Sequence, residues 1–127
     1  MNRKSKNKLY LVAAAVTIII IIVGSTIYQH RAGDLDGLAS CLEANGARMY
    51  GAFWCSACNA QKEMFGQSAR LLPYVECSTA DGQTMTFACQ GKNISAYPTW
   101  EFADGTTQVG VMSLGDLAAE TGCQEVL

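Results

Sequence analysis

The chain has 127 residues with a formal net charge of −2, and its first quarter differs in composition from the rest. All eleven acidic residues lie beyond residue 28, where five basic residues accompany them, so that part carries a net charge of −6. This charge excludes a domain built to bind nucleic-acid phosphates, and its length of about 100 residues allows one modest hydrophobic core.

The amino terminus has the composition of a membrane anchor. Residues 1–8, MNRKSKNK, are basic, and residues 9–28, LYLVAAAVTIIIIIVGSTIY, carry no charge. About 20 apolar residues, with a rise of about 1.5 Å each, cover a hydrocarbon layer of roughly 30 Å. Because flanking Lys and Arg resist translocation, we predict a cytoplasmic segment at 1–8, a transmembrane helix at 9–28, a linker at 29–34 and an extracytoplasmic domain at 35–127.

A secretory signal peptide is the alternative for this segment, since it has the same basic start and apolar middle. Its apolar run is normally about 7 to 15 residues long and ends in small residues at a cleavage site. The run in this chain is longer and ends in TIYQHR. We therefore favour an uncleaved signal-anchor in the cell membrane, although both alternatives export the remainder of the chain.

The exported part alternates between helical and extended patterns. Leu35, Leu38 and Leu42 stand at helical spacing at its start, and Pro73 ends a second helical stretch. Asp104-Gly105 lies between two extended stretches, which is typical of a hairpin turn. Ser113 is a suitable N-cap for the last helix. We predict helices at 35–46, 55–72, 87–95 and 113–122, and strands at 47–53, 74–78, 98–103 and 106–111.

The order of these elements predicts the fold class. A strand followed by a helix and a second strand implies a parallel pair joined by a crossover. The domain is therefore expected to be α/β, with helices on the faces of a central sheet.

Two cysteines stand three positions apart in AFWCSACNA, where the strand at 47–53 ends and the next helix begins. This is the position of a Cys-x-x-Cys redox motif of the thioredoxin type. Cys55, in the first turn, lies among unpartnered N–H groups, and the helix dipole favours its thiolate. Cys58 comes round to the same side one turn later and deeper. We predict Cys55 as the nucleophile and Cys58 as the resolving thiol, with their disulfide as the redox group and no other cofactor.

A second marker is SAYPTW, in which Pro98 precedes a strand. In the thioredoxin arrangement this proline is cis, packs beside the cysteine pair and leaves the backbone of the residue before it, here Tyr97, open to an extended substrate. A proline that only starts a strand is the alternative. Trp54, next to the motif, is either a further substrate contact that shields the sulfurs or an ordinary core aromatic residue.

The other four cysteines fit an exported domain, in which disulfides persist. Cys77 ends a strand and Cys89 begins the next helix, so a structural disulfide there would contribute on the order of 3 kcal/mol. A redox shuttle pair and free thiols are the alternatives. Cys41 and Cys123 lie near the two ends of the domain, and a bond between them would join those ends. Free buried thiols or a disulfide to another chain are the alternatives for this pair.

The run RMYGAFWCSACNAQKEMFG, with LPYVECS and YPTWEF, resembles the thioredoxin-like domain that accompanies bacterial vitamin K epoxide reductase homologues. The resemblance covers nearly all of residues 35–122. It implies a thioredoxin-like fold and a relay of oxidising equivalents in disulfide bond formation. It also implies that a membrane partner reoxidises the dithiol and passes the electrons to a quinone. A second cysteine pair of the family is matched by Cys77 and Cys89.

Three features depart from that family or bear on the direction of electron flow. Ser56-Ala57 stands where the family commonly has Pro-His, and this dipeptide helps to set the reduction potential. Met49 stands six residues before Cys55, where thioredoxins that reduce substrates carry a buried acid, which favours an oxidising or isomerising role. The domain also follows a single span, so its quinone-linked partner would be a separate protein, near which the anchor would hold Cys55.

We therefore expect a membrane-anchored extracytoplasmic thiol-disulfide oxidoreductase that oxidises the thiols of exported proteins and is reoxidised by a quinone-linked membrane enzyme similar to vitamin K epoxide reductase. A thiol reductase or isomerase of such proteins is one alternative, and a noncatalytic binding module with a thioredoxin fold is another. A zinc site would need all four of Cys55, Cys58, Cys77 and Cys89, which the strand-to-helix position and Pro98 disfavour. The only histidine, His30, borders the membrane segment. We expect no bound metal.

Overall fold

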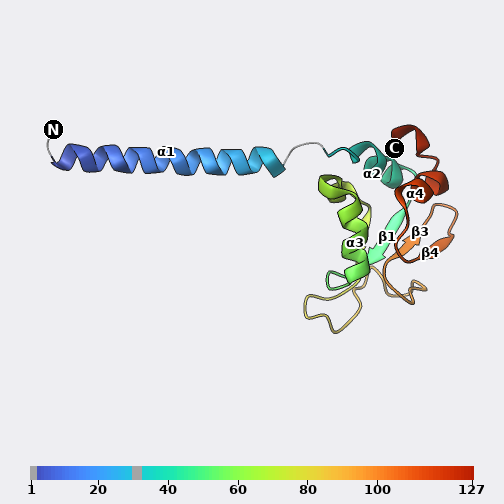
Figure 1. The fold of residues 1–127 in the computed structure, drawn as a ribbon. Helices are drawn as coiled ribbons and strands as arrows, with labels where there is room; N and C mark the ends of the chain where they lie inside the picture. Colours follow the sequence, from blue (N-terminus) through green and yellow to red (C-terminus); the bar gives the residue numbers. More distant parts are fainter. Residues whose placement is uncertain (1–2, 30–32) are drawn as a thin grey trace. The chain divides into compact units, whose positions relative to one another are not determined.

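The computed structural model describes residues 3–29 and 33–127 (Figure 1). Parts of the predicted basic segment and linker, together with His30, lie outside the described residues. The chain divides into two compact units, Met1–Arg31 and Ala32–Leu127.

The first unit contains one long helix, α1 (Arg3–Gln29). Its apolar stretch, Lys6–Ile27, has 22 residues and a mean hydropathy of 2.5. By length and composition this helix can cross a bilayer, because its stretch exceeds the roughly 20 residues that a hydrocarbon core requires. The predicted apolar helix is therefore present, and its orientation in a membrane stays a prediction.

The second unit is built on a mixed sheet with the strand order β2-β1-β3-β4. The central strand β1 pairs in parallel with β2 and antiparallel with β3, which pairs antiparallel with β4. Helices flank this sheet, so the predicted α/β, thioredoxin-like fold is confirmed (Figure 1). The strands are β1 (Arg48–Gly51), β2 (Tyr74–Glu76), β3 (Thr99–Glu101) and β4 (Thr107–Val109), and the α-helices are α2 (Asp36–Ala44), α3 (Ser56–Met64) and α4 (Leu114–Thr121).

The prediction of one continuous helix at 55–72 is wrong, because two helical segments lie in this range. The α-helix α3 ends at Met64, and a 3₁₀ helix, η1 (Gly66–Leu71), follows it. Gly66 lies at the junction with a φ of +52°, in the left-handed region that commonly ends an α-helix. Pro73 then follows the second segment and precedes β2.

The predicted helix at 87–95 is also wrong, because these residues form turns. Their backbone bonds are short-range, such as Cys89 N–H to Thr86 O at 3.1 Å and Lys92 N–H to Cys89 O at 3.2 Å. Gly91 takes a φ of +82°, and Cys89 is bonded covalently to Cys77. A left-handed residue and a covalent attachment at this point interrupt the regular helical ladder.

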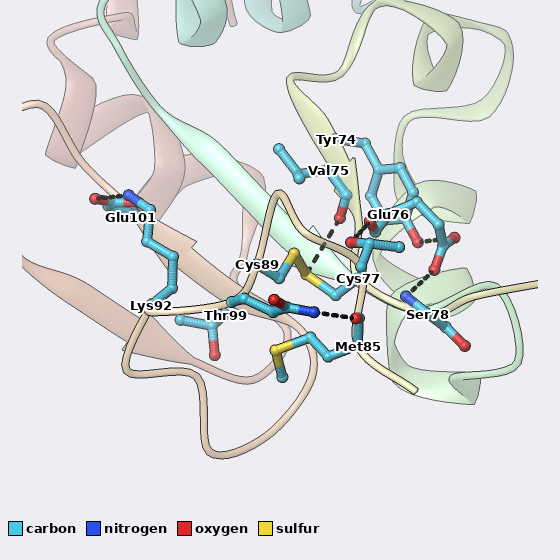
Figure 2. Close-up of a disulfide and its surroundings, with 12 residues drawn as sticks. Tyr74, Val75, Glu76, Cys77, Ser78, Met85, Cys89, Lys92, Thr99 and Glu101 are labelled. Atoms are coloured by element: carbon cyan, nitrogen blue, oxygen red, sulfur yellow. Dashed lines mark hydrogen bonds and ion pairs between the residues drawn. A yellow bond between two sulfur atoms is a disulfide. The ribbon is translucent and has the colours of Figure 1, made fainter. Parts of the chain in front are cut away.

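Both cysteine pairs outside the motif are joined as disulfides. Cys41 in α2 is bonded to Cys123 just after α4, with their Cα atoms 6.0 Å apart. This bond links the first and last α-helices of the second unit. Cys77, just after β2, is bonded to Cys89, with Cα atoms 5.4 Å apart (Figure 2). It closes the loop that follows β2.

A buried glutamine attaches α3 to the rest of the core. Gln61 is fully buried, and its Oε1 accepts hydrogen bonds from the Met112 N–H at 2.8 Å and from Trp100 Nε1 at 3.3 Å. Its Nε2 donates to the Met112 carbonyl at 3.1 Å. Because Trp100 belongs to β3 and Met112 precedes α4, one side chain connects α3 to both. The fully buried apolar residues around this attachment include Leu38, Leu42, Met49 and Leu117.

Replacing this glutamine by leucine is expected to destabilise the domain. Gln61→Leu keeps a similar volume but leaves the Met112 N–H and the Trp100 indole N–H buried without a partner. We expect the free energy of unfolding to fall by about 2 to 4 kcal/mol. Urea unfolding of the full chain in detergent micelles, followed by tryptophan fluorescence, measures this loss. Gln67→Leu, at an exposed position, is the control and should change it by less than about 0.5 kcal/mol; equal losses would contradict the role of Gln61.

Candidate redox-active site

The structure brings Cys55 and Cys58 together at the N-terminus of α3. Cys55 is the N-cap residue, with extended backbone angles, and its Sγ accepts the Cys58 N–H at 3.1 Å. This is the geometry in which helix N-termini bind anions. Neither sulfur takes part in a disulfide in this structure.

The two sulfurs differ in accessibility. Cys55 is 8% exposed, whereas Cys58 is fully buried. A thiol or disulfide of a second molecule therefore reaches Cys55 first. Burial raises the pKa of the Cys58 thiol to about 12, and its hydrogen bond with Cys55 adds to the shift, while Lys62 partly opposes it. Cys58 is consequently a neutral thiol near neutral pH, which suits a group that reacts second.

Cys58 lies against the end of β1 and beside the first residue of β2. A Cβ atom on Gly51 would stand 2.9 Å from Cys58 Sγ and 2.8 Å from the Tyr74 ring, so the thiol and the ring both approach the position that a side chain would take. The Tyr74 hydroxyl donates to Glu76 Oε2 at 2.8 Å (Figure 2). Lys62 Nζ lies 3.3 Å from the centre of the Tyr74 ring, a cation-π contact. Burial and the neighbouring Glu76 raise the pKa of Tyr74 well above its usual range.

An open groove with a volume of about 570 Å³ lies beside Cys55. Trp54 and Tyr97 meet across it edge to face, with ring centroids 6.0 Å apart. The Trp54 indole, 55% exposed, donates from Nε1 to Ser78 Oγ at 2.9 Å, which fixes its orientation. The groove is lined by Trp54, Cys55, Ser56, Ala57, Met85, Ile94, Ser95, Ala96 and Tyr97.

The segment before β3 contains the second sequence marker. The peptide bond between Tyr97 and Pro98 is cis. The Pro98 side chain is fully buried and takes no part in the groove lining, whereas Tyr97 contributes to it. Within the described part of the chain, the backbone N–H and C=O of Tyr97 have no hydrogen-bond partner. Of the three predicted substrate contacts, Trp54 and Tyr97 therefore line the groove, and Pro98 lies beneath it.

Sequence reasoning did not single out several residues of this site. Met85 and Ile94 form part of the groove wall, and both pack against the buried cluster that contains the disulfide between Cys77 and Cys89. Tyr74 and Glu76 stand two positions apart in a strand, so they share one face. That spacing is a local signal that could have marked them as a pair, but their approach to Cys58 depends on strand pairing.

The sulfurs do not assemble into a metal site in the part of the chain that is described. Cys77 and Cys89 are bonded to each other, so they cannot join Cys55 and Cys58 as thiolate ligands while that bond is intact. Across residues 3–29 and 33–127, no group of three or more His, Cys, Asp or Glu side chains is placed to hold a metal ion.

The close contacts at Gly51 predict that adding a single methyl group there destabilises the domain. In Gly51→Ala, the new Cβ would lie within 3 Å of both the Tyr74 ring and Cys58 Sγ, so one of them must move. We expect a loss of about 1 to 3 kcal/mol in the free energy of unfolding, measured by urea unfolding of the full chain in micelles. Gly115→Ala, whose nearest neighbour would be 3.9 Å away, is the matched control and should be neutral or stabilising. Equal stability of both variants would show that the space over Gly51 is not tight.

A known oxidoreductase is similar in sequence to about two thirds of this chain. No family model matches the chain. The chain is similar to the thiol-disulfide oxidoreductase LTO1 of Arabidopsis thaliana, with 45% identity over 89 residues. The match covers 67% of this chain and 23% of the plant protein, so the chain spans about a quarter of that relative's length. This identity supports a relationship to a thiol-disulfide oxidoreductase.

Proposed function

We propose that this chain is a membrane-anchored, extracytoplasmic thiol-disulfide oxidoreductase that oxidises exported proteins. The observation that carries the proposal is the pair of unequal sulfurs at the start of α3. Cys55 lies at the rim of a groove, and Cys58 lies one turn behind it and is fully buried. A dithiol with one accessible and one sheltered sulfur suits a reaction in which the accessible sulfur forms a mixed disulfide and the sheltered sulfur resolves it. The similarity to LTO1 supports the same activity.

The proposed reaction transfers one disulfide to a substrate. A substrate thiolate attacks Cys55 Sγ of the oxidised pair, the bond between Cys55 and Cys58 breaks, and Cys58 leaves with the electron pair and takes a proton. A second substrate thiolate then attacks the substrate sulfur of the mixed disulfide, and Cys55 leaves. The substrate loses two electrons to form its disulfide, and the protein ends as a dithiol.

The groove would hold the substrate as an extended segment. The unpaired N–H and C=O of Tyr97 are available to a substrate backbone, in the manner of strand addition. Trp54 and Ile94 would contact its apolar side chains. Because both kinds of contact tolerate many sequences, this site suits a range of exported proteins.

We further propose that a separate membrane oxidoreductase, similar to vitamin K epoxide reductase, reoxidises the dithiol and passes the electrons to a quinone. A helix with the length and hydropathy of α1 would keep Cys55 at the membrane surface. Confinement of both proteins to one membrane raises their effective concentration without any new contact.

The oxidising direction is favoured over the reductase alternative by the core of β1. Met49 is fully buried and pairs with Trp100 of β3. Reducing thioredoxins place an acid at the position of Met49, and an apolar residue there removes that proton acceptor from the strand.

Cysteine variants test the proposed activity. Cys55→Ala should abolish disulfide formation in exported proteins, because the sulfur that receives the first attack is missing. Cys58→Ala should instead accumulate mixed disulfides between Cys55 and exported proteins, visible as bands that a reductant removes on electrophoresis. The double variant Cys55→Ala/Cys58→Ala is the control and should trap none. Normal disulfide formation with Cys55→Ala would favour the noncatalytic binding module.

The reduction potential of the pair tests the direction of electron flow. We expect a value of about −120 to −180 mV for an oxidant, measured by equilibration of Cys55 and Cys58 with a glutathione buffer and mass analysis of the alkylated thiols. A value near that of thioredoxin, about −270 mV, would contradict the oxidising role and support the thiol reductase.

A further inference from the structure

The buried thiol of Cys58 needs a route for its proton. Cys58 is fully buried, and burial raises its pKa to about 12, so almost none of it is thiolate near neutral pH. It must nevertheless become a thiolate to attack the sulfur of Cys55. Met49 on β1 offers no proton acceptor. The neighbouring strand β2 supplies polar groups in its place.

Cys58 and Tyr74 meet over Gly51. The position that a Gly51 Cβ would take lies 2.9 Å from Cys58 Sγ and 3.4 Å from the Tyr74 hydroxyl. The Cys58 thiol and the Tyr74 hydroxyl therefore both border the small space beside Gly51, which has no side chain to separate them. This closeness allows a proton to pass from the thiol to the hydroxyl.

The hydroxyl of Tyr74 is in turn bonded to a fixed carboxylate. It donates to Glu76 Oε2 at 2.8 Å, and Glu76 Oε1 accepts the N–H of Ser78 at 2.9 Å (Figure 2). The same Oε1 accepts the N–H of Phe53 at 3.3 Å. These bonds hold the carboxylate against Tyr74. Glu76 is half-buried, so it also has contact with solvent. The groups run in order from the buried sulfur to the hydroxyl, the carboxylate and water.

We propose that Tyr74 and Glu76 form a proton relay for Cys58. This inference rests on the proposed oxidoreductase function. When a mixed disulfide on Cys55 is resolved, the Cys58 proton passes to the Tyr74 oxygen while the Tyr74 proton passes to Glu76 Oε2. Cys58 thiolate attacks Cys55 Sγ, the new bond joins the two cysteines, and the partner sulfur leaves with the electron pair and takes a proton from water. Glu76 releases its proton to solvent.

The same relay serves the opposite step. When a substrate thiolate breaks the disulfide between Cys55 and Cys58, the departing Cys58 thiolate takes a proton from the Tyr74 hydroxyl. Tyr74 then receives a proton from Glu76, and Glu76 receives one from water. Tyr74 stays protonated between the steps, since its own pKa is raised by burial and by Glu76. It therefore acts by passing a proton in concert and not by ionising.

The test separates the two chemical steps with glutathione disulfide as the probe. The full chain in micelles, with Cys55 and Cys58 reduced, is mixed with the probe, quenched with acid and analysed by mass. Attack by Cys55 adds one glutathione, and attack by Cys58 removes it. In Glu76→Gln, Oε1 can still accept both backbone N–H groups, but the side chain cannot take a proton. We expect an unchanged first step and a second step about 100-fold slower at pH 7.

The pH profile distinguishes a relay from a structural effect. Without the relay, Cys58 depends on hydroxide, so the deficit of Glu76→Gln should shrink by about tenfold for each pH unit above 7. Tyr74→Phe, which keeps the ring and loses the hydroxyl, should show the same deficit and slope, and the double variant should be no slower than either. The titratable and charged groups that face Cys58 are Cys55 and Lys62 at and within α3, Tyr74 on β2 and Tyr97 beside the groove, while Glu76 acts through Tyr74.

The outcomes bear separately on the two proposals. Glu101→Gln, on β3 and paired with Lys92 on the surface, is the matched control and should resolve the mixed disulfide at the wild-type rate. A wild-type second step in Glu76→Gln, or a deficit that does not change with pH, would overturn the relay while the first step upholds the oxidoreductase. Absence of the first step in the wild-type chain would overturn the proposed function itself.

Discussion

The hydrogen bonds of Gln61 determine where α3 lies, and the candidate site depends on that position. An amide inside an apolar core is stable only when its donors and acceptors are satisfied, and Gln61 achieves this with Trp100 on β3 and Met112 before α4. Since α3 carries Cys58 and begins at Cys55, one attachment sets the position of both sulfurs relative to the sheet. These hydrogen bonds also fix the rotation of α3 about its own axis, which apolar packing alone specifies less strictly.

With α3 in place, burial separates the two cysteines chemically. They are the same residue type one helical turn apart, but one lies at the rim of a groove and the other behind it. In the proposed reaction, the greater accessibility of Cys55 gives it the first step, and Cys58, whose pKa is raised by burial, reacts second once its proton is removed. Under the proposed function, the resolution of a mixed disulfide therefore depends on the structure around Cys58 as well as on the motif.

The groove is built from segments that are distant from one another in the sequence. The disulfide between Cys77 and Cys89 closes the loop that carries Met85, and the turn before β3 brings Tyr97 opposite Trp54. The helix predicted at 87–95 does not form, because the disulfide and the left-handed Gly91 interrupt the helical hydrogen bonds. The spacing of hydrophobic residues, on which the prediction is based, indicates neither feature. The helix at 55–72 was interrupted for a related reason, a left-handed glycine at its middle.

The sequence by itself determined the alternation of strands and helices, the apolar N-terminal helix and the cysteine pair at a strand-to-helix junction, because periodicity, caps and turn residues act within a few neighbouring positions. The tertiary structure alone decided which side chains surround the sulfurs. The parallel register of β1 and β2 sets Gly51 opposite Glu76, and this pairing brings Tyr74 to Cys58. Register between segments more than 20 residues apart depends on the packing of the whole sheet, which no local pattern encodes.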